Sequence, residues 1–303
     1  MKDRIERFKN VHLNFVPASV VRAAAVKRLA ASDLSFPGVE FKIASSEEEM
    51  AGAFALLEEC YVRRGIARES QMRLQVISLL PTTTTFVARK GRHIIGTLSL
   101  IEDSDLGLPM EKVHPSEVSR VRGLYRHIAE VGALAISADH RRSGLSIMLY
   151  NMIYRWARHW RHVDDMLIAV HPSARHFYRN ILLFETLGAV QSYRGLGGAA
   201  SLPMRLDIPG AQRRFHNIYH NRIVDRNGKL DFYRFFCAPS DRFDFSSHPE
   251  FHAHRSKKSP LDESAVMQLM DRFSLSGKEF AENEATALRR HFPKISFSMD
   301  GAA

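Results

Sequence analysis

The sequence predicts an α/β (α+β) protein in which a mixed central β-sheet is flanked by helices. Three observations carry this prediction. Short β-rich runs alternate with helical stretches from about residue 40 to residue 208; two of these runs flank a short glycine-bearing turn; and an apolar strand leads through Arg-Arg-Ser-Gly into an apolar helix. A hairpin gives antiparallel pairing and a strand–helix–strand unit gives parallel pairing, so both should occur in one sheet.

The first half of this region opens with a strand and a capped helix. Residues 40–44 alternate as a strand does, and Ser46 with Glu49 has the capping-box spacing at the start of a helix. Residues 83–89 and 93–101 follow as two β-rich runs, separated by three residues that include a glycine. This pattern predicts a β-hairpin.

The second half predicts a strand, a helix and further alternation. An apolar run at 128–137 is typical of a central strand, and the following apolar stretch has helical periodicity. The remaining expected elements are helices at 145–160 and 174–183 and strands at 166–170, 189–194 and 202–208.

Three regions are expected along the chain. Residues 1–39 form a basic N-terminal segment with a helix from Ser19 to Ala31; residues 40–210 form the main domain; and residues 211–303 form a mostly helical C-terminal extension of unknown role. The alanine-rich N-terminal helix has two interpretations: it folds over the main domain, or it docks on a membrane surface or a partner.

The chain carries an excess of basic residues. Lys and Arg number 43 against 33 Asp and Glu, a formal charge of +10, which favours acidic partners such as an acidic carrier protein, an anionic membrane or nucleic acid. Nucleic acid ranks low, because no base-stacking or groove-reading motif is present.

The cysteine count and hydropathy favour a cytoplasmic protein. Cys60 and Cys237 are far apart, which excludes a disulfide framework, and no apolar run reaches the roughly 20 residues of a bilayer span. His248, His252 and His254 lie close together in the sequence, but their spacing matches no common zinc pattern, so no metal site is expected.

The order of these elements resembles the GNAT superfamily of acyltransferases. The residues that carry the resemblance are Arg141 to Ser146 after the central strand, then Phe177-Tyr178, Phe184 and Gly188. Within that superfamily the chain is most similar to the bacterial N-acyl amino acid synthases, relatives of the acyl-homoserine-lactone synthases. The narrower similarity rests on TTTFVA (83–88), GTLSL (96–100), Gly107-Leu108-Pro109, AEVGALA (129–135) and LPMRLD (202–207).

Glu130 is predicted to position or deprotonate the acceptor amine, because it is a carboxyl group within an otherwise apolar strand just before the Arg-Arg-Ser-Gly turn. Burying a carboxylate is costly, and sites tuned for proton transfer often tolerate that cost. The alternative is a structural acid paired with Arg122 or Arg126. Transfer of an acyl group from a thioester to an amine needs such a base, an oxyanion donor and a proton source for the thiolate.

The turn that follows is the predicted phosphate site of the acyl donor. Backbone N–H groups at a helix start bind phosphate without a metal, and here the turn comprises Arg141, Arg142, Ser143, Gly144, Leu145 and Ser146. Ser146 departs from the superfamily pattern, which has Gly or Ala there; this suits the single phosphate of a carrier-bound phosphopantetheine better than the diphosphate of coenzyme A. The resemblance also implies that backbone donors near Ala135 and Ile136 hold the oxyanion.

Further residues receive roles as expectations. The resemblance implies that Tyr178 protonates the leaving thiolate, with simple helix packing as the alternative. One of Arg120, Arg122 and Arg126, with Arg122 and Arg126 as the named candidates, is expected to bind the carboxylate of the amino acid acceptor, with a surface charge as the alternative. Met148 and Phe184 are expected to line the acyl chain, with ordinary core packing as the alternative.

Arg155, Arg158 and Arg161 recur three residues apart, which would place them along one side of a helix next to the phosphate turn. An acidic acyl carrier protein could dock on such a patch, and a solvated helix face is the alternative.

The resemblance therefore implies transfer of a long-chain fatty acyl group from acyl carrier protein, or less favourably coenzyme A, to the amino group of an amino acid. No tightly bound cofactor is expected. The alternatives are an acetyl-coenzyme-A-dependent N-acetyltransferase and a non-catalytic acyl-carrier sensor. The expected geometry has a thioester arm that enters the gap beside the middle of the sheet, is tethered by the amides at Gly144 and has its carbonyl facing Glu130. It requires that the Glu130 carboxylate does not lie on the far side of the sheet, remote from the Gly144 turn.

Overall fold

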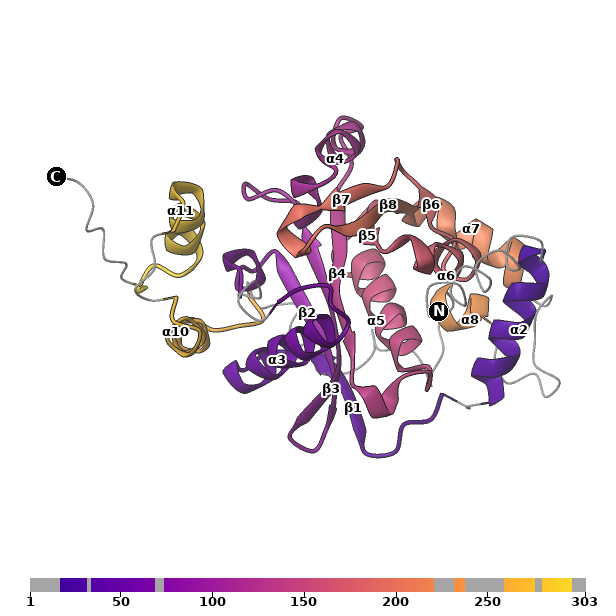
Figure 1. Ribbon diagram of the computed structural model, residues 1–303, viewed down its shortest axis with the longest axis horizontal. Helices are drawn as coiled ribbons and strands as arrows, with labels where there is room; N and C mark the ends of the chain where they lie inside the picture. Colours follow the sequence, from indigo (N-terminus) through magenta and orange to yellow (C-terminus); the bar gives the residue numbers. More distant parts are fainter. Residues whose placement is uncertain are drawn as a thin grey trace.

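The computed structural model describes residues 17–31, 34–68, 74–220, 232–237, 259–275 and 280–295. A mixed eight-stranded sheet runs through the centre of this part of the chain, and helices cover both of its faces (Figure 1). The strands are β1 (Val39–Ile43), β2 (Thr83–Lys90), β3 (His93–Glu102), β4 (Ile128–Ile136), β5 (Asp165–Val170), β6 (Glu185–Thr186), β7 (Gln191–Tyr193) and β8 (Ala199–Asp207).

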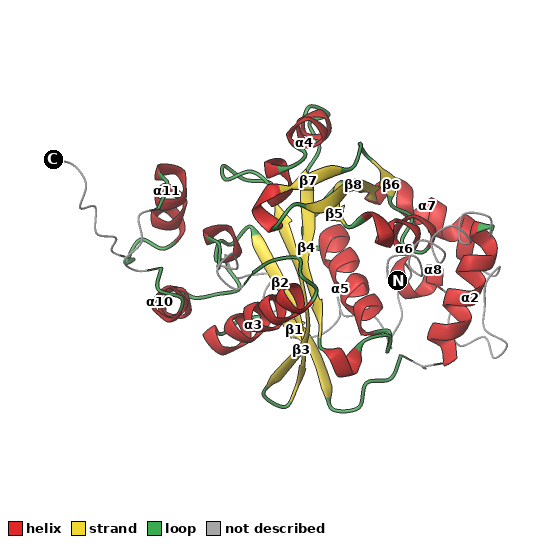
Figure 2. Ribbon diagram, in the orientation of Figure 1, coloured by secondary structure: helices red, strands yellow, loops and turns green. Residues whose placement is uncertain are grey.

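The helices alternate with these strands over most of the chain, as Figure 2 shows. The α-helices are α2 (Ala18–Ala31), α3 (Glu47–Arg63), α4 (Pro115–Arg122), α5 (Leu145–His159), α6 (Arg175–Asn180), α7 (Ile208–Tyr219), α8 (Phe232–Cys237), α10 (Glu263–Arg272) and α11 (Glu282–His291). Short 3-10 turns are η2 (Val76–Ser78), η3 (Pro109–Lys112), η4 (Ala138–His140), η5 (Pro172–Ala174) and η6 (Arg194–Leu196).

The sheet has the strand order β1-β2-β3-β4-β5-β8-β6, and β7 pairs with β8. β4 and β5 run parallel, whereas the other pairs are antiparallel. The predicted hairpin is the β2–β3 pair, and α5 is the crossover that makes β5 parallel to β4. The mixed sheet predicted from the sequence is therefore confirmed.

Local sequence signals explain where the elements begin, and two expected elements differ. Ser46 caps α3 by accepting a hydrogen bond from Glu49 N at 3.3 Å, but the Glu49 carboxylate accepts from Ser45 N and not from Ser46 N. The helix expected at 174–183 is shorter, and the strand expected at 189–194 is only the three residues of β7. The sequence predicted no bounds for α4, α7, α8 or the two-residue strand β6, and α8 and β6 are too short to show a period.

The two faces of the sheet carry separate cores. On the face covered by α5, Phe86 and Leu98 pack with Leu149. On the opposite face, covered by α3, Val87 packs with residues of α3 and α10, including Leu269. Figure 1 shows α5 and α3 on either side of the strands. We call these the α5 face and the α3 face.

The C-terminal helices are divided between these two faces. α7 begins directly after β8, where the Asp207 side chain accepts a hydrogen bond from Gly210 N, and it buries Phe215 in the α5-face core. α10 and α11 instead pack on the α3 face. The extra C-terminal helices expected from the sequence are therefore present, and they extend the cores on both sides of the sheet.

The N-terminal helix α2 packs against the rest of the molecule. Val26 is 1% exposed in the α5-face core, and Val21 and Ala25 pack against that core. This arrangement matches the interpretation of a helix folded over the main domain. Among the helices in the described segments, none combines the length and apolar character that crossing a bilayer requires.

Candidate active site

A β-bulge interrupts β4 in the middle of the sheet. Its pairing with β3 slips by one residue, so that Ala133 and Leu134 of β4 lie opposite Leu98 of β3. Ala133 has a φ of 55°, in the left-handed region that residues other than glycine seldom adopt. An extra residue of this kind bends and twists a strand, and such bulges are frequent beside active sites.

The bulge also reverses which side chains face α5. Ala129 and Val131 belong to the α5-face core before the bulge, whereas Leu134 and Ile136 pack against that core after it. Glu130, which lies between Ala129 and Val131, therefore points to the α3 face.

β4 and β5 separate immediately after Glu130. The pair spans Ile128↔Asp165 to Glu130↔Leu167, although both strands continue for several residues beyond it. Residues 132–134 of β4 and 169–170 of β5 are half-buried. Residues on both sides of this separation are thus partly exposed, and among the described residues no strand pairs with the two facing edges there, so their backbone polar groups can bind a ligand.

Only one carboxyl oxygen of Glu130 has a hydrogen-bond partner among the described residues. Its carboxyl group is buried, and Oε2 accepts a hydrogen bond from Met110 N at 2.7 Å. Oε1 has no hydrogen-bond partner among the described residues. Burial raises the pKa of Glu130 to about 8, although the Met110 N–H opposes this shift. The alternative that Glu130 pairs with Arg122 or Arg126 is wrong, because both arginines bind other carboxylates.

The predicted phosphate turn has the backbone shape of an anion site. Arg142 has a φ of 65° and Gly144, the N-cap residue of α5, a φ of 94°. The Ser143 hydroxyl accepts from Leu145 N at 3.3 Å and so occupies one of the donors at the helix start. Within the part of the chain that the structure describes, the backbone N–H groups of Arg142, Ser143, Gly144 and Ser146 have no hydrogen-bond partner. Free N–H groups at a helix start attract anions.

Two contacts fix this turn against the sheet. A Cβ added to Gly96 of β3 would lie 2.3 Å from Leu145 Cδ2, so the absence of a side chain lets the start of α5 sit directly on the strand. Arg141 Nε is buried and has no hydrogen-bond partner in the described segments, and Arg141 Nη2 lies 4.0 Å from Cys60 Sγ. A donor in this position is compatible with an anion at the turn.

The turn and Glu130 lie on opposite faces of the sheet, so the expectation that both act from one side is wrong. The turn opens α5 on one face, whereas the Glu130 side chain points to the other. Six residues of β4 separate Glu130 from Ile136, which corresponds to about 20 Å of extended strand. An arm anchored at the turn can reach Glu130 only by passing between β4 and β5. The strand separation opens at Glu130 itself.

Ala135 and Ile136 lie near the turn, at the far end of β4 from Glu130. Ala135 packs with Leu56 and Cys60 on the α3 face, and Ile136 O accepts a hydrogen bond from Cys60 Sγ at 3.4 Å. Ala135 follows Glu130 by five positions along β4, so its backbone donors lie farther from Glu130 than those at the bulge. Contact with the donor arm remains a prediction for Ala135 and Ile136.

Tyr178 belongs to a tyrosine cluster that the sequence did not predict. Its hydroxyl oxygen lies 2.7 Å from the Tyr150 hydroxyl of α5, and burial raises the pKa of both groups. Tyr61, from the last turn of α3, has its pKa raised to about 12 by burial, and Tyr178, Glu130 and Tyr193 add to that rise. The cluster therefore reaches from the α5 face to Glu130 on the α3 face. Tyr178 as the proton donor stays a prediction.

The arginines expected to bind the acceptor are engaged in ion pairs. Arg122 donates to Asp103 and Glu111, whereas Arg126 lies 2.7 Å from Asp165 and also pairs with Asp207. Their guanidinium groups are thus committed to protein carboxylates, and this speaks against the predicted role in acceptor binding.

Asp165 also connects three strands. It is fully buried at the start of β5, and it contacts both Arg126, just before β4, and Arg205 of β8, which donates to it at 2.8 and 3.0 Å. This group holds together the end of the sheet at which β4 and β5 do pair.

The three arginines expected to form a carrier-docking patch do not form one. Arg155 is 2% exposed and donates to Asn151 Oδ1 and to Phe235 O, so it holds α8 against α5. Arg158 donates to Gln212, and Arg161 lies beyond the end of α5 and pairs with Glu102. Moreover, α5 is about 22 Å long, so its last turn lies far from the phosphate turn at its start. The predicted patch is therefore wrong in both composition and position.

Met148 and Phe184 are buried core residues. They are 4% and 2% exposed in the α5-face core, and Phe184 packs edge to face on Tyr178 with ring centroids 6.0 Å apart. This is the packing that the alternative interpretation expected, and a role in lining the acyl chain stays a prediction.

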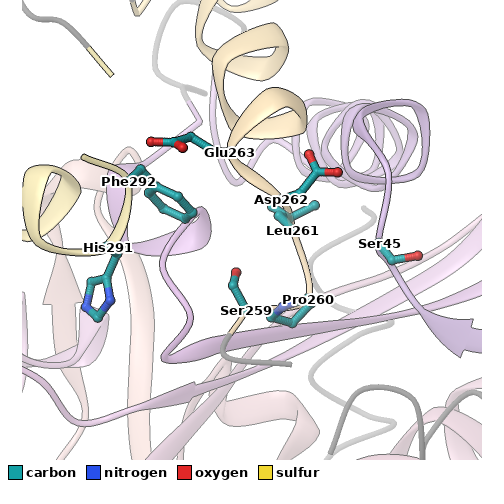
Figure 3. Close-up of a pocket in the computed structure, with 8 residues that line it drawn as sticks. All are labelled: Ser45, Ser259, Pro260, Leu261, Asp262, Glu263, His291 and Phe292. Carbon is teal, nitrogen blue, oxygen red and sulfur yellow. The ribbon is translucent and has the colours of Figure 1, made fainter. Parts of the chain in front are cut away.

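A cavity of about 350 Å³ lies between the loop before α10, the end of α11 and Ser45, away from every predicted site residue (Figure 3). Its carboxylates already have partners, since Asp262 accepts from Ala265 N and Glu263 from Lys294 N. Within the described segments no group of three or more His, Cys, Asp or Glu residues could hold a metal ion. His248, His252 and His254 lie outside the described residues.

Comparisons with known proteins agree with this architecture. The family described as N-acyl amino acid synthase FeeM matches residues 52–207, which is more than half of the chain. The structure of FeeM, an N-acyl amino acid synthase from uncultured soil microbes, is 26% identical with a TM-score of 0.52, and the match covers 59% of this chain and 96% of FeeM.

More distant structures also match. BjaI, a coenzyme-A-dependent acyl-homoserine lactone synthase, is 15% identical (TM-score 0.42; 59% of this chain, 89% of BjaI). An acyl-CoA N-acyltransferase from Pseudomonas aeruginosa is 14% identical (TM-score 0.39; 55% of this chain, 98% of that chain). No curated protein sequence gives a significant match.

Strands β2 to β8, the strand separation after Glu130 and the helix-start turn thus lie within the segment that matches the family, and β1 precedes it. The chain belongs to the FeeM family of N-acyl amino acid synthases, acyltransferases with the GNAT fold.

Proposed function

We propose that this protein transfers a fatty acyl group from acyl carrier protein to the amino group of an amino acid, with Glu130 as the base. The family supplies the reaction class. The observation that carries the assignment of the base is the state of Glu130: a buried carboxyl group beside the strand separation, with one oxygen bound to Met110 N and the other without a partner among the described residues.

The pKa of Glu130, raised by burial to about 8, suits this role. A free α-amino group has a pKa near 8, so a proton passes between the two groups with little energetic cost. The neutral amine nitrogen attacks the thioester carbonyl carbon, the C–N bond forms and the C–S bond breaks. The proton that the nitrogen loses balances the proton that the departing thiolate gains, and the products are an amide and a thiol.

Tyr178 is our candidate for the donor of that second proton. Its hydroxyl is hydrogen-bonded to Tyr150, and burial raises its pKa, so it stays protonated at neutral pH. Backbone N–H groups beside the bulge at Ala133 are nearer to Glu130 than those at Ile136, and we assign the oxyanion to that stretch.

The donor is proposed to be held by its phosphate at the turn of Arg142 to Ser146, with Arg141 adding charge. The net charge of +10 favours an acidic carrier protein over an uncharged partner. Met148 and Phe184 remain proposals for residues near the acyl chain.

Arg64 is our candidate for binding the carboxylate of the acceptor, in place of Arg122 and Arg126. It caps the C-terminus of α3, and its guanidinium group has no partner among the described residues. Burial raises the pKa of Tyr61 and Tyr178, and the charge of Arg64 acts against that rise at both, so the guanidinium lies close to the tyrosine cluster.

The experiment incubates the purified protein with an amino acid mixture and a long-chain acyl group, supplied either on acyl carrier protein or on coenzyme A, and analyses products by mass spectrometry. We expect an N-acyl amino acid from the carrier-bound donor, and a loss of about 100-fold or more in kcat for Glu130→Gln. Formation of product only from acetyl-coenzyme A, or none from folded protein, would contradict the proposal.

A further inference from the structure

We infer that Arg122 is a positioning residue for Glu130: it clamps the 103–111 loop so that the Met110 N–H stays directed at the Glu130 carboxylate. The inference rests on the proposed role of Glu130 as the base. It replaces the substrate-binding role that the sequence suggested for Arg122.

Arg122 joins the two ends of this loop. Its Nε and Nη2 donate to the two oxygens of Asp103 at 2.7 and 2.8 Å, just after β3. The same guanidinium donates to both oxygens of Glu111, which belongs to η3 at the other end of the loop. A planar guanidinium suits such paired contacts with two carboxylates.

Glu111 connects Arg122 to η3, the turn whose Met110 N–H binds Glu130. Its Oε1 accepts a hydrogen bond from Leu108 N at 2.7 Å, and a Cβ added to Gly107 would lie 2.8 Å from the same oxygen. The carboxylate is thus folded tightly over the start of η3. Met110, one residue earlier than Glu111, gives its N–H to Glu130 Oε2.

The clamp is also electrostatic. The charged or titratable groups near Glu130 are Glu111 and Lys112 of η3, Tyr61 of α3 and Tyr193 of β7. Burial raises the pKa of Glu130 most, the negative charge of Glu111 raises it further, and Lys112 lowers it. Arg122 lies against Glu111 and offsets its charge.

The test measures the pH dependence of kcat/KM for wild type, Arg122→Gln, Glu111→Gln and the double variant. Removing Arg122 leaves the charge of Glu111 uncompensated, so the pH at half-maximal kcat/KM should rise by about half a unit. Glu111→Gln should lower the pH at half-maximal kcat/KM, because it removes the negative charge of Glu111. The amide oxygen of Gln can still accept a hydrogen bond from Leu108 N. The double variant should have the same pH at half-maximal kcat/KM as Glu111→Gln, and not that of Arg122→Gln.

Arg272→Gln is the matched control, because Arg272 forms an exposed ion pair with Glu47 at 2.7 Å. It should leave the pH profile unchanged. A shift in Arg122→Gln no larger than in this control, or a double variant that behaves like Arg122→Gln, would overturn the clamp.

A second measurement needs no catalysis. We would compare the free energy of unfolding of each variant with that of the same variant carrying Glu130→Gln, from pH 4 to 9. The difference between the two reports the titration of Glu130 alone. The midpoint of this titration should shift up in Arg122→Gln and down in Glu111→Gln, as the pH at half-maximal kcat/KM does. If no donor gives product, the proposed function fails while this titration still decides whether the clamp exists.

Discussion

At the scale of single residues, Glu130 keeps its proton in the folded chain well above the pH at which a free glutamate releases it. Burial raises its pKa from 4.5 to about 8. The unfolded chain therefore releases this proton first as the pH rises, and the folded state becomes relatively less favourable. The proposed base thus lowers stability in the pH range where the proposed reaction needs it.

Glu130→Gln should remove this cost. The contribution of Glu130 to the free energy of unfolding falls by about 1.4 kcal/mol per pH unit between roughly pH 4.5 and pH 8. We expect the variant to be more stable than wild type by several kcal/mol at pH 8, and this gain to vanish near pH 4. Urea unfolding across that range measures it, with the exposed Glu48→Gln as control. A gain that does not change with pH would count against the raised pKa.

The sequence found some site residues and missed others for identifiable reasons. Glu130 could be identified from the sequence, because an acidic residue within an apolar strand is recognisable without a structure. Tyr61 and Tyr150 sit at ordinary helical positions, so only folding shows that they meet Tyr178 and Glu130. The role of Arg122 was misjudged for the same reason, since one partner, Asp103, lies 19 residues away along the chain.

At the scale of elements, the turn from β4 into α5 was predictable and the bulge before it was not. Arg-Arg-Ser-Gly followed by an apolar run is a recognisable helix start, and the structure has Gly144 as N-cap. The bulge places an alanine, Ala133, in the left-handed region, which its residue type disfavours. Pairing with β3 on one side and release from β5 on the other impose that conformation.

Gly96→Ala tests how closely α5 must approach β3. The added methyl group would meet Leu145, which is 1% exposed and has no free space, so we expect a loss of about 1–2 kcal/mol in stability. Because the start of α5 shifts, KM for the acyl donor should rise several-fold, with a smaller effect on kcat. Steady-state kinetics and denaturant unfolding measure both.

The matched control is Gly123→Ala. Gly123 ends α4 with a φ of −62°, and an added Cβ there would have its nearest neighbour at 3.4 Å. This variant should stay within about 0.5 kcal/mol of wild type. An unchanged donor KM in Gly96→Ala would show that the seating of α5 does not govern donor binding.

At the scale of the whole molecule, the sequence predicted the order of strands and helices but not the placement of the C-terminal helices. Hydrophobic periodicity gives the type of each element. It does not tell which face of the sheet an amphipathic helix will cover. Phe215 of α7 is buried with α5, whereas Leu269 of α10 is buried with α3.

Leu269→Ala tests whether the helices after β8 unfold with the sheet. Leu269 is fully buried on the α3 face, so we expect the single unfolding transition to lose about 2–5 kcal/mol. Met267→Ala, at a side chain that is 40% exposed, should change it little. A separate, earlier transition in Leu269→Ala, with the main one unmoved, would instead mean that α10 and α11 form an independent unit.

The buried group of Arg126, Asp165 and Arg205 has a mechanical consequence. These ion pairs hold β4 and β5 together at one end of the sheet. The two strands are already separated at the other end without a ligand. If the proposed donor enters between the two strands, it breaks no hydrogen bonds of the sheet, and the thiol product can leave by the same route. The proposed reaction then requires no separation of paired strands.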